Sequence, residues 1–215
     1  ADSTIRDTFE EMLLAAGKSE EPEKLVEVDE HCGQLIDRRY FVLEHIASGG
    51  MGSVYKAIQR PLERTVAMKF MKVDDDAREE LEERFFLEAC LCARLTHPNT
   101  VRIFDYGQHG EEIYYIVMEY LEGKTLEGVV KAQGAIEPLR VVRMTKQVCA
   151  ALSEAHEKGL VHRDIKLSNL FLTNHQLTGD FVKVLDFGLV KQMNFDKRAT
   201  RDGMALGSPL FMSPE

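Results

Sequence analysis

The stretch His162-Arg163-Asp164-Ile165-Lys166-Leu167-Ser168-Asn169 decides the fold. It lies between a helical pattern and a short apolar run, so we expect a loop held by two regular elements. Asp164 has the chemistry to accept a proton from a hydroxyl, Lys166 to neutralise a phosphoryl group in transfer, and Asn169 to ligate a metal ion. Their spacing allows the three side chains to converge on one small volume.

Composition bounds the class of protein. The chain has 215 residues, 44% of them hydrophobic, enough for one large domain or two small ones with a real core. A net charge of -9 argues against a dedicated nucleic-acid binder, which is usually basic. No apolar run approaches the roughly 20 residues that span a bilayer, and no signal peptide is visible at the start. We expect a cytoplasmic chain, and a cytoplasmic domain of a membrane protein stays open.

The four cysteines predict no disulfide framework. Cys90 and Cys92 are two apart on a predicted helix, so they point to different faces. Free thiols in a reducing compartment are the expectation.

The chain changes character near Tyr40. Residues 1–37 read as an N-terminal extension, partly disordered, because residues 18–23 are acidic and contain a proline. A sheet of five antiparallel strands and one long helix, residues 77–95, are predicted next. The expected strands are 40–47, 54–59, 64–73, 101–106 and 113–120.

The second half is predicted to be mainly helical. Residues 126–132 and the apolar stripe within residues 141–155 follow a helical period. Residues 170–172 and 182–185 read as two short strands, and residues 189–206 as a loop.

Glycines join the first two predicted strands. Residues 48–54 read Ser-Gly-Gly-Met-Gly-Ser-Val. Such a turn lets backbone N–H groups approach phosphate oxygens, although a structural hairpin turn is an equal alternative.

A lysine interrupts the third predicted strand. Lys69 follows Val66-Ala67-Met68 on an alternating apolar strand, where an unpaired charge is costly. Glu88 breaks the apolar face of the long helix in the same way and is a candidate partner. A surface lysine and a surface glutamate are the alternative.

Two further motifs follow the opening stretch. Asp186-Phe187-Gly188 comes at the end of a predicted strand, and the chain closes on Gly207-Ser208-Pro209-Leu210-Phe211-Met212-Ser213-Pro214-Glu215.

In this order and over residues 40–215, these motifs resemble the protein kinase family, and Lys166 is typical of its serine/threonine members. The Gly49-Gly50-Met51-Gly52 run is similar to the bacterial eukaryotic-like, or Hanks-type, branch. Ala47 stands where the family's first glycine is usual. The resemblance implies an α+β, bilobal fold with an N-lobe at 38–121 and part of a C-lobe at 122–215. It also implies further helices after residue 215, without which the stripe of residues 141–155 would be exposed.

The resemblance implies the site residues as well. Lys69 would position the ATP phosphates and pair with Glu88, Asp164 would act as base, and Lys166 would stabilise the γ-phosphoryl group. Asn169 and Asp186 would bind Mg²⁺ or Mn²⁺. The nucleotide-contacting residues would be Ala47, Ser48, Gly49, Gly50, Met51, Gly52, Val54, Ala67, Lys69, Met118, Glu119, Leu121 and Phe171.

The implied activity is transfer of the γ-phosphoryl group of ATP to Ser/Thr hydroxyls of protein substrates. Ser208 would hydrogen-bond Asp164 and Lys166, and Arg163 would pair with an autophosphorylated Thr200. The alternative is a pseudokinase or ATP-binding scaffold, which would lack one of Lys69, Asp164, Asn169 or Asp186. A small-molecule phosphotransferase is a third possibility, and the closing segment argues against it.

Overall fold

The computed structural model describes residues 29, 31–49, 52–72, 86–87, 89–110, 113–175, 179–187 and 211. The labelled elements all lie within residues 31–215, which form one compact unit of the chain.

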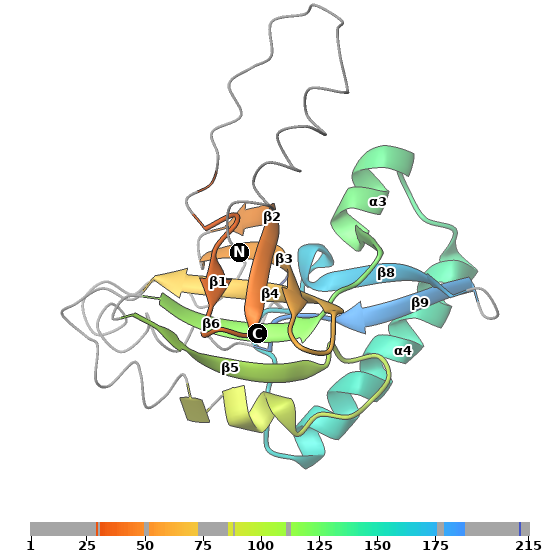
Figure 1. Cartoon of the computed structure of the whole chain (residues 1–215). Helices are drawn as coiled ribbons and strands as arrows, with labels where there is room; N and C mark the ends of the chain where they lie inside the picture. Colours follow the sequence, from red (N-terminus) through yellow and green to blue (C-terminus); the bar gives the residue numbers. More distant parts are fainter. Residues whose placement is uncertain are drawn as a thin grey trace, which may run out of the picture. The chain divides into compact units, whose positions relative to one another are not determined.

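The larger sheet has six strands, all antiparallel, in the order β1-β2-β3-β4-β6-β5 (Figure 1). The strands are β1 (Leu35–Ile36), β2 (Tyr40–Gly49), β3 (Gly52–Gln59), β4 (Arg64–Lys72), β5 (Ile103–His109) and β6 (Ile113–Glu119). All five predicted strands are present. A sixth, β1, lies in the segment predicted as an extension, and its two residues are too few for alternation to reveal.

Several predicted strand boundaries differ from the observed ones, and the start of β5 differs for a physical reason. The strand expected at 101–106 begins at Ile103, because the residues before it pair elsewhere. The Val101 N–H donates to the Val184 carbonyl at 2.9 Å, and the Val184 N–H donates to the Asn99 carbonyl at 2.7 Å. This segment therefore joins the larger sheet to the second half of the chain.

Alternation along β4 assigns its side chains to two faces of the sheet. Val66, Met68 and Phe70 are buried on one face, in a core cluster with Tyr55 and Val117. Ala67 and Lys69 lie on the other face. They are paired with Met118 and Ile116 of β6, and Lys69 also with Val54 of β3. This second face carries the residues predicted to meet the nucleotide.

Helices follow the predicted pattern where the structure describes them. Residues 86–87 and 89–93 are helical, with Cys90 exposed and Cys92 buried, as expected from their spacing. Both are free thiols. The helix α3 (Leu126–Gln133) is capped by Thr125, whose hydroxyl oxygen accepts the Gly128 N–H at 3.1 Å.

The long helix α4 (Pro138–Glu157) is capped at its N-terminus by Glu137, whose carboxylate accepts the N–H groups of Leu139 and Arg140. It contradicts part of one expectation. Most of the apolar stripe of residues 141–155 is not exposed, because Met144, Val148, Ala151 and Ala155 are buried against other elements of this chain. Burying each larger apolar side chain contributes about 1.5–3 kcal/mol. Val141, the first residue of the stripe, is exposed, and so are its neighbours Leu139 and Val142.

A three-stranded sheet completes the second half: β7 (Gly123–Thr125), β8 (Leu170–His175) and β9 (Gly179–Val184). The pair β8–β9 was predicted, and β7 was not. The short helix η2 (Leu167–Asn169) leads into β8. Figure 1 shows α4 running beside β9, and their buried residues belong to one core cluster with Ile116 and Cys92 of the first half.

No helix in the described part of the chain combines the length and hydropathy needed to cross a bilayer.

Candidate active site

The opening stretch folds into a loop whose polar side chains converge. Asn169 lies at the end of η2 and donates its amide N–H groups to the Asp164 carbonyl at 2.8 Å and to Asp164 Oδ2 at 3.2 Å. The Lys166 Nζ lies 3.0 Å from the same Asp164 oxygen. Asp164 and Asn169 are buried, and Lys166 is about one quarter exposed. The predicted convergence of the three residues is confirmed.

The buried side chain of His162 connects this loop to the segment after β9. Its Nε2 bonds the Leu185 carbonyl at 2.8 Å, and its Nδ1 lies 3.3 Å from the backbone nitrogen of Asp164. A ring that donates from Nε2 and accepts at Nδ1 is neutral, and burial lowers the pKa of His162, which favours that form. We assigned no role to this histidine from the sequence. The apolar residues near it in the chain were the signal that could have indicated its burial.

Two residues of this region have left-handed backbone angles. Arg163 has φ of 61° and Asp186 has φ of 48°, in the left-handed region that residues other than glycine rarely adopt. Such conformations persist only where surrounding contacts impose them, and they gather at functional sites. Arg163 directly precedes Asp164, and Asp186 lies two residues after the end of β9.

The lysine of β4 faces the same region. Lys69 is 6% exposed, and its Nζ lies 2.9 Å from Asp186 Oδ1. Lys69 and the tripeptide motif, which are far apart in sequence, therefore meet in the structure. Glu88, the expected partner of Lys69, lies outside the described residues.

The two groups of residues are bonded to each other. The Leu185 N–H donates to the Asn169 carbonyl at 2.9 Å, which holds the residue before Asp186 against the loop that carries Asp164. The site therefore contains two lysines and two aspartates around a buried asparagine. This arrangement can neutralise a polyanion and accept a proton beside it.

The comparisons with known proteins agree with this geometry. A family model described as protein kinase domain matches residues 40–215. The chain belongs to the protein kinase family.

Its relatives include bacterial serine/threonine-protein kinases. Pkn3 of Myxococcus xanthus is 38% identical over 192 residues, covering 88% of this chain and 35% of that protein. PrkC of Bacillus subtilis is 39% identical over 183 residues, covering 85% of this chain and 27% of that protein. The chain thus spans about a third or less of the length of these relatives.

Solved structures show the same fold. The PknI kinase domain of Mycobacterium tuberculosis matches with a TM-score of 0.63 and 28% identity, over 73% of this chain and 62% of that one. Rad53 in complex with AMP-PNP matches with a TM-score of 0.62 and 28% identity, over 71% of this chain and 39% of that one.

The predicted glycine-rich turn connects β2 to β3. Ala47, Ser48 and Gly49 close β2, and Gly52 opens β3 with φ of 124°. Ala47 is absent from the residues with positive φ, so alanine is tolerated there. Gly50 and Met51 lie outside the described residues.

The other residues predicted to contact the nucleotide lie on β3, β4, β6 and β8 and in the segment after β6. Val54 and Ala67 lie on the second face of the larger sheet, Met118 and Glu119 end β6, Leu121 follows, and Phe171 lies on β8 beside Thr125.

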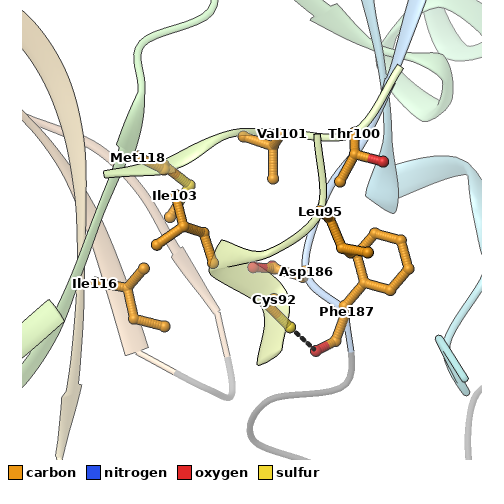
Figure 2. A pocket seen from close by; sticks show the side chains of 9 residues that line it. All are labelled: Cys92, Leu95, Thr100, Val101, Ile103, Ile116, Met118, Asp186 and Phe187. Atoms are coloured by element: carbon orange, nitrogen blue, oxygen red, sulfur yellow. Dashed lines mark hydrogen bonds between the residues drawn. The ribbon is translucent and has the colours of Figure 1, made fainter. Parts of the chain in front are cut away.

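A mainly apolar pocket extends behind Met118 (Figure 2). Figure 2 shows Phe187 beside Cys92 and Leu95, with the Cys92 thiol 3.8 Å from the Phe187 carbonyl. The Phe187 ring lies 4.7 Å from that of His162, centre to centre. Phe187 is thus packed inward, which leaves Asp186 beside Lys69. The pocket residues are Cys92, Leu95, Thr100, Val101, Ile103, Ile116, Met118, Asp186 and Phe187.

Several motif residues cannot be placed. Gly188, Thr200 and Ser208 lie outside the described residues, as does the closing segment except Phe211, which is exposed.

Proposed function

We propose that this chain carries the catalytic site of an ATP-dependent serine/threonine protein kinase, which transfers the γ-phosphoryl group of ATP to Ser/Thr hydroxyls of protein substrates. The observation that carries the proposal is the single bonded cluster of Asp164, Lys166 and Asn169, joined through Leu185 to the Lys69–Asp186 pair.

The sheet face above the cluster is assigned to the nucleotide. Lys69 is a nearly buried cation that exchanges part of its interaction with Asp186 for the phosphates of ATP. Val54, Ala67 and Phe171 supply apolar surface for adenine, and the backbone of Glu119 and Leu121 meets its edge. The glycine-rich turn, Ala47 to Gly52 including Ser48, Gly49, Gly50 and Met51, covers the phosphates with backbone N–H groups.

Asn169 and Asp186 are assigned to a divalent cation, Mg²⁺ or Mn²⁺. The Asn169 amide nitrogen donates to Asp164, so its side-chain oxygen is oriented as an acceptor. One amide oxygen and one carboxylate suit a hard cation that takes its remaining ligands from phosphate and water. The bound ion would neutralise charge on the β- and γ-phosphates. The described residues contain no group of three or more His, Cys, Asp or Glu side chains arranged to hold a metal ion, so the proposed ion depends on phosphate and water for its other ligands.

Asp164 orients the substrate hydroxyl and accepts its proton. Its carboxylate is held by Lys166 and Asn169, so little reorganisation accompanies the reaction. Lys166 lies 3.0 Å from that carboxylate, close enough to compensate charge on the transferring group as well. Glu88 completes the proposed catalytic set as a partner of Lys69.

Regulation is assigned to Arg163 and Thr200. Arg163 precedes the base in a strained backbone conformation, and a phosphate on Thr200 would be an anionic group that this arginine can bind. We expect phosphopeptide mapping of the active protein to find Thr200 modified; active protein with Thr200 unmodified would overturn this assignment. Because ATP is the co-substrate, we assign the chain to the cytoplasm.

Retention of Lys69, Asp164, Asn169 and Asp186 argues against a pseudokinase. The test of the proposed function is transfer of radiolabel from [γ-³²P]ATP to matched peptides that offer Ser, Thr or Tyr as the only hydroxyl acceptor. We expect label on Ser and Thr peptides, dependent on Mg²⁺ or Mn²⁺. Nucleotide binding without any transfer would support the scaffold alternative, and preference for Tyr would contradict the assigned specificity.

A further inference from the structure

Glu119 and Lys183 form an ion pair between the end of β6 and β9. The Lys183 Nζ lies 2.6 Å from Glu119 Oε1. The side chains are 24% and 14% exposed, so the pair is better shielded from water than a surface salt bridge. Neither side chain belongs to the nucleotide-contacting or catalytic groups above, although the Glu119 backbone does.

Each partner also bonds the segment between the helical residues 89–93 and β5. The Lys183 Nζ donates to the Thr100 carbonyl at 3.3 Å. Glu119 Oε1 accepts the Arg102 N–H at 2.8 Å, and the Glu119 N–H donates to the Arg102 carbonyl at 3.0 Å. The ion pair therefore closes a junction of three segments that are distant in sequence.

This junction connects the two ends of the nucleotide site. On one side, Glu119 carries the backbone assigned to the adenine edge. On the other, β9 is bonded to residues 99–101 and leads within two residues to Asp186, which pairs with Lys69. Movement of the adenine-contacting segment relative to β9 would break the Glu119–Lys183 bond or displace Asp186.

We propose that Glu119 and Lys183 are positioning residues, which fix the distance between the adenine-contacting segment and the phosphate-binding Asp186. The proposal deepens the proposed function and rests on it. The pair touches no reacting atom and acts through the backbone. Loss of one partner would leave the other charge half-buried and would loosen the segment that receives adenine.

A second ion pair on the same strand offers a matched control. Arg140 of α4 binds Asp180 through both carboxylate oxygens, at the opposite end of β9. Its side chains are 31% and 29% exposed, so it is also a partly shielded pair. It joins β9 to a helix and not to the adenine-contacting segment. If ion pairs on β9 only stabilised the fold, loss of the Arg140–Asp180 pair and loss of the Glu119–Lys183 pair would weaken nucleotide binding equally.

The experiment compares Lys183→Met, Lys183→Arg and Arg140→Met in the full chain. The dissociation constant for the magnesium complex of a non-hydrolysable ATP analogue is measured by calorimetry, alongside KM for ATP, kcat and the melting temperature. We expect Lys183→Met to raise the dissociation constant and KM about tenfold, with kcat changed less, a difference that one charge-assisted contact can supply. Lys183→Arg should stay within about twofold of the wild type, and so should Arg140→Met despite a lower melting temperature.

The proposal is overturned if Lys183→Met binds the analogue as the wild type does, binds it more tightly, or loses no more affinity than Arg140→Met. If Lys183→Met does not fold, Glu119→Gln replaces it, because the amide keeps the shape and the acceptor for Arg102. Glu119→Gln should then weaken binding at least about threefold, and unchanged affinity overturns the proposal. Wild-type protein that binds the analogue without transferring phosphate contradicts only the proposed function, whereas wild-type protein that binds no nucleotide contradicts both.

Discussion

Gly52 and Gly49 flank the same turn but differ in what their surroundings require. A Cβ atom at Gly52 would lie 1.9 Å from the backbone oxygen of Phe70, and φ is 124° there. At Gly49 the added atom would meet nothing within 4 Å. The glycine at position 52 is therefore needed for close approach of β3 to β4.

We expect Gly52→Ala to destabilise the protein by about 2 to 4 kcal/mol, from backbone strain and steric overlap together. Gly49→Ala should change stability by less than about 1 kcal/mol. The measurement is urea denaturation followed by circular dichroism. Equal stabilities of the two variants would show that the approach to Phe70 does not constrain β3.

For Lys69, the sequence predicted that the side chain has a partner but not which partner it has. A lysine on an alternating apolar strand predicts a partner, and the structure supplies one in Asp186. The pattern alone left the alternative of a surface lysine open, because it cannot show which face of a strand is covered. In contrast, the side-chain contact of Glu119 with Lys183 has no local signal, since each residue is an ordinary charge in its own segment.

At the scale of elements, Glu154 fastens α4 to the turn that follows the helical residues 89–93. Its carboxylate accepts the backbone N–H groups of Thr96 and His97 and the Thr96 hydroxyl, and it pairs with Lys158 at 2.8 Å. Partial burial alone would raise the pKa of Glu154. The hydrogen bonds outweigh burial and lower the pKa to about 2.

A pKa lowered in the folded state adds stability above the unfolded value of about 4.5, and this stability is lost as the pH falls toward 2. We expect Glu154→Gln to lower the stability by about 1 to 3 kcal/mol at pH 7. Between pH 4.5 and pH 2 the difference from the wild type should shrink. Thermal unfolding across this range measures it, with the exposed Glu157→Gln as control. A difference that stays constant with pH would contradict the role of the Glu154 charge.

Elements of ordinary length could be predicted from the sequence, and the shortest ones could not. Seven strands and the helices α3 and α4 follow from apolar patterns and helical periods. β1 and β7 have two and three residues, so no period can appear in them. The start of β5 was wrong because Val101 bonds with Val184, a partner that sequence patterns do not reveal.

At the scale of the molecule, the order of the motifs predicted that distant segments meet, and the bonded path from His162 through Leu185 to Asn169 explains how they do. What sequence reasoning misjudged was the covering of α4. Most of its stripe is buried in one core cluster with residues of β9 and of the first half, because β9 packs along the helix, whereas Val141 is exposed. The elements that carry the site therefore share one core cluster with residues of the first half.

The central claim is that Asp164 acts as the base of the phosphoryl transfer, whereas other residues of the site bind the nucleotide. The most direct test is single-turnover transfer from ATP to a Ser peptide by the wild type and by Asp164→Asn, with nucleotide affinity measured on the same samples. The amide keeps an oxygen that accepts the Asn169 N–H, so the loop geometry is expected to persist. We predict a rate lower by at least about 100-fold with affinity for ATP within about twofold. Equal transfer rates for the two proteins would contradict the claim.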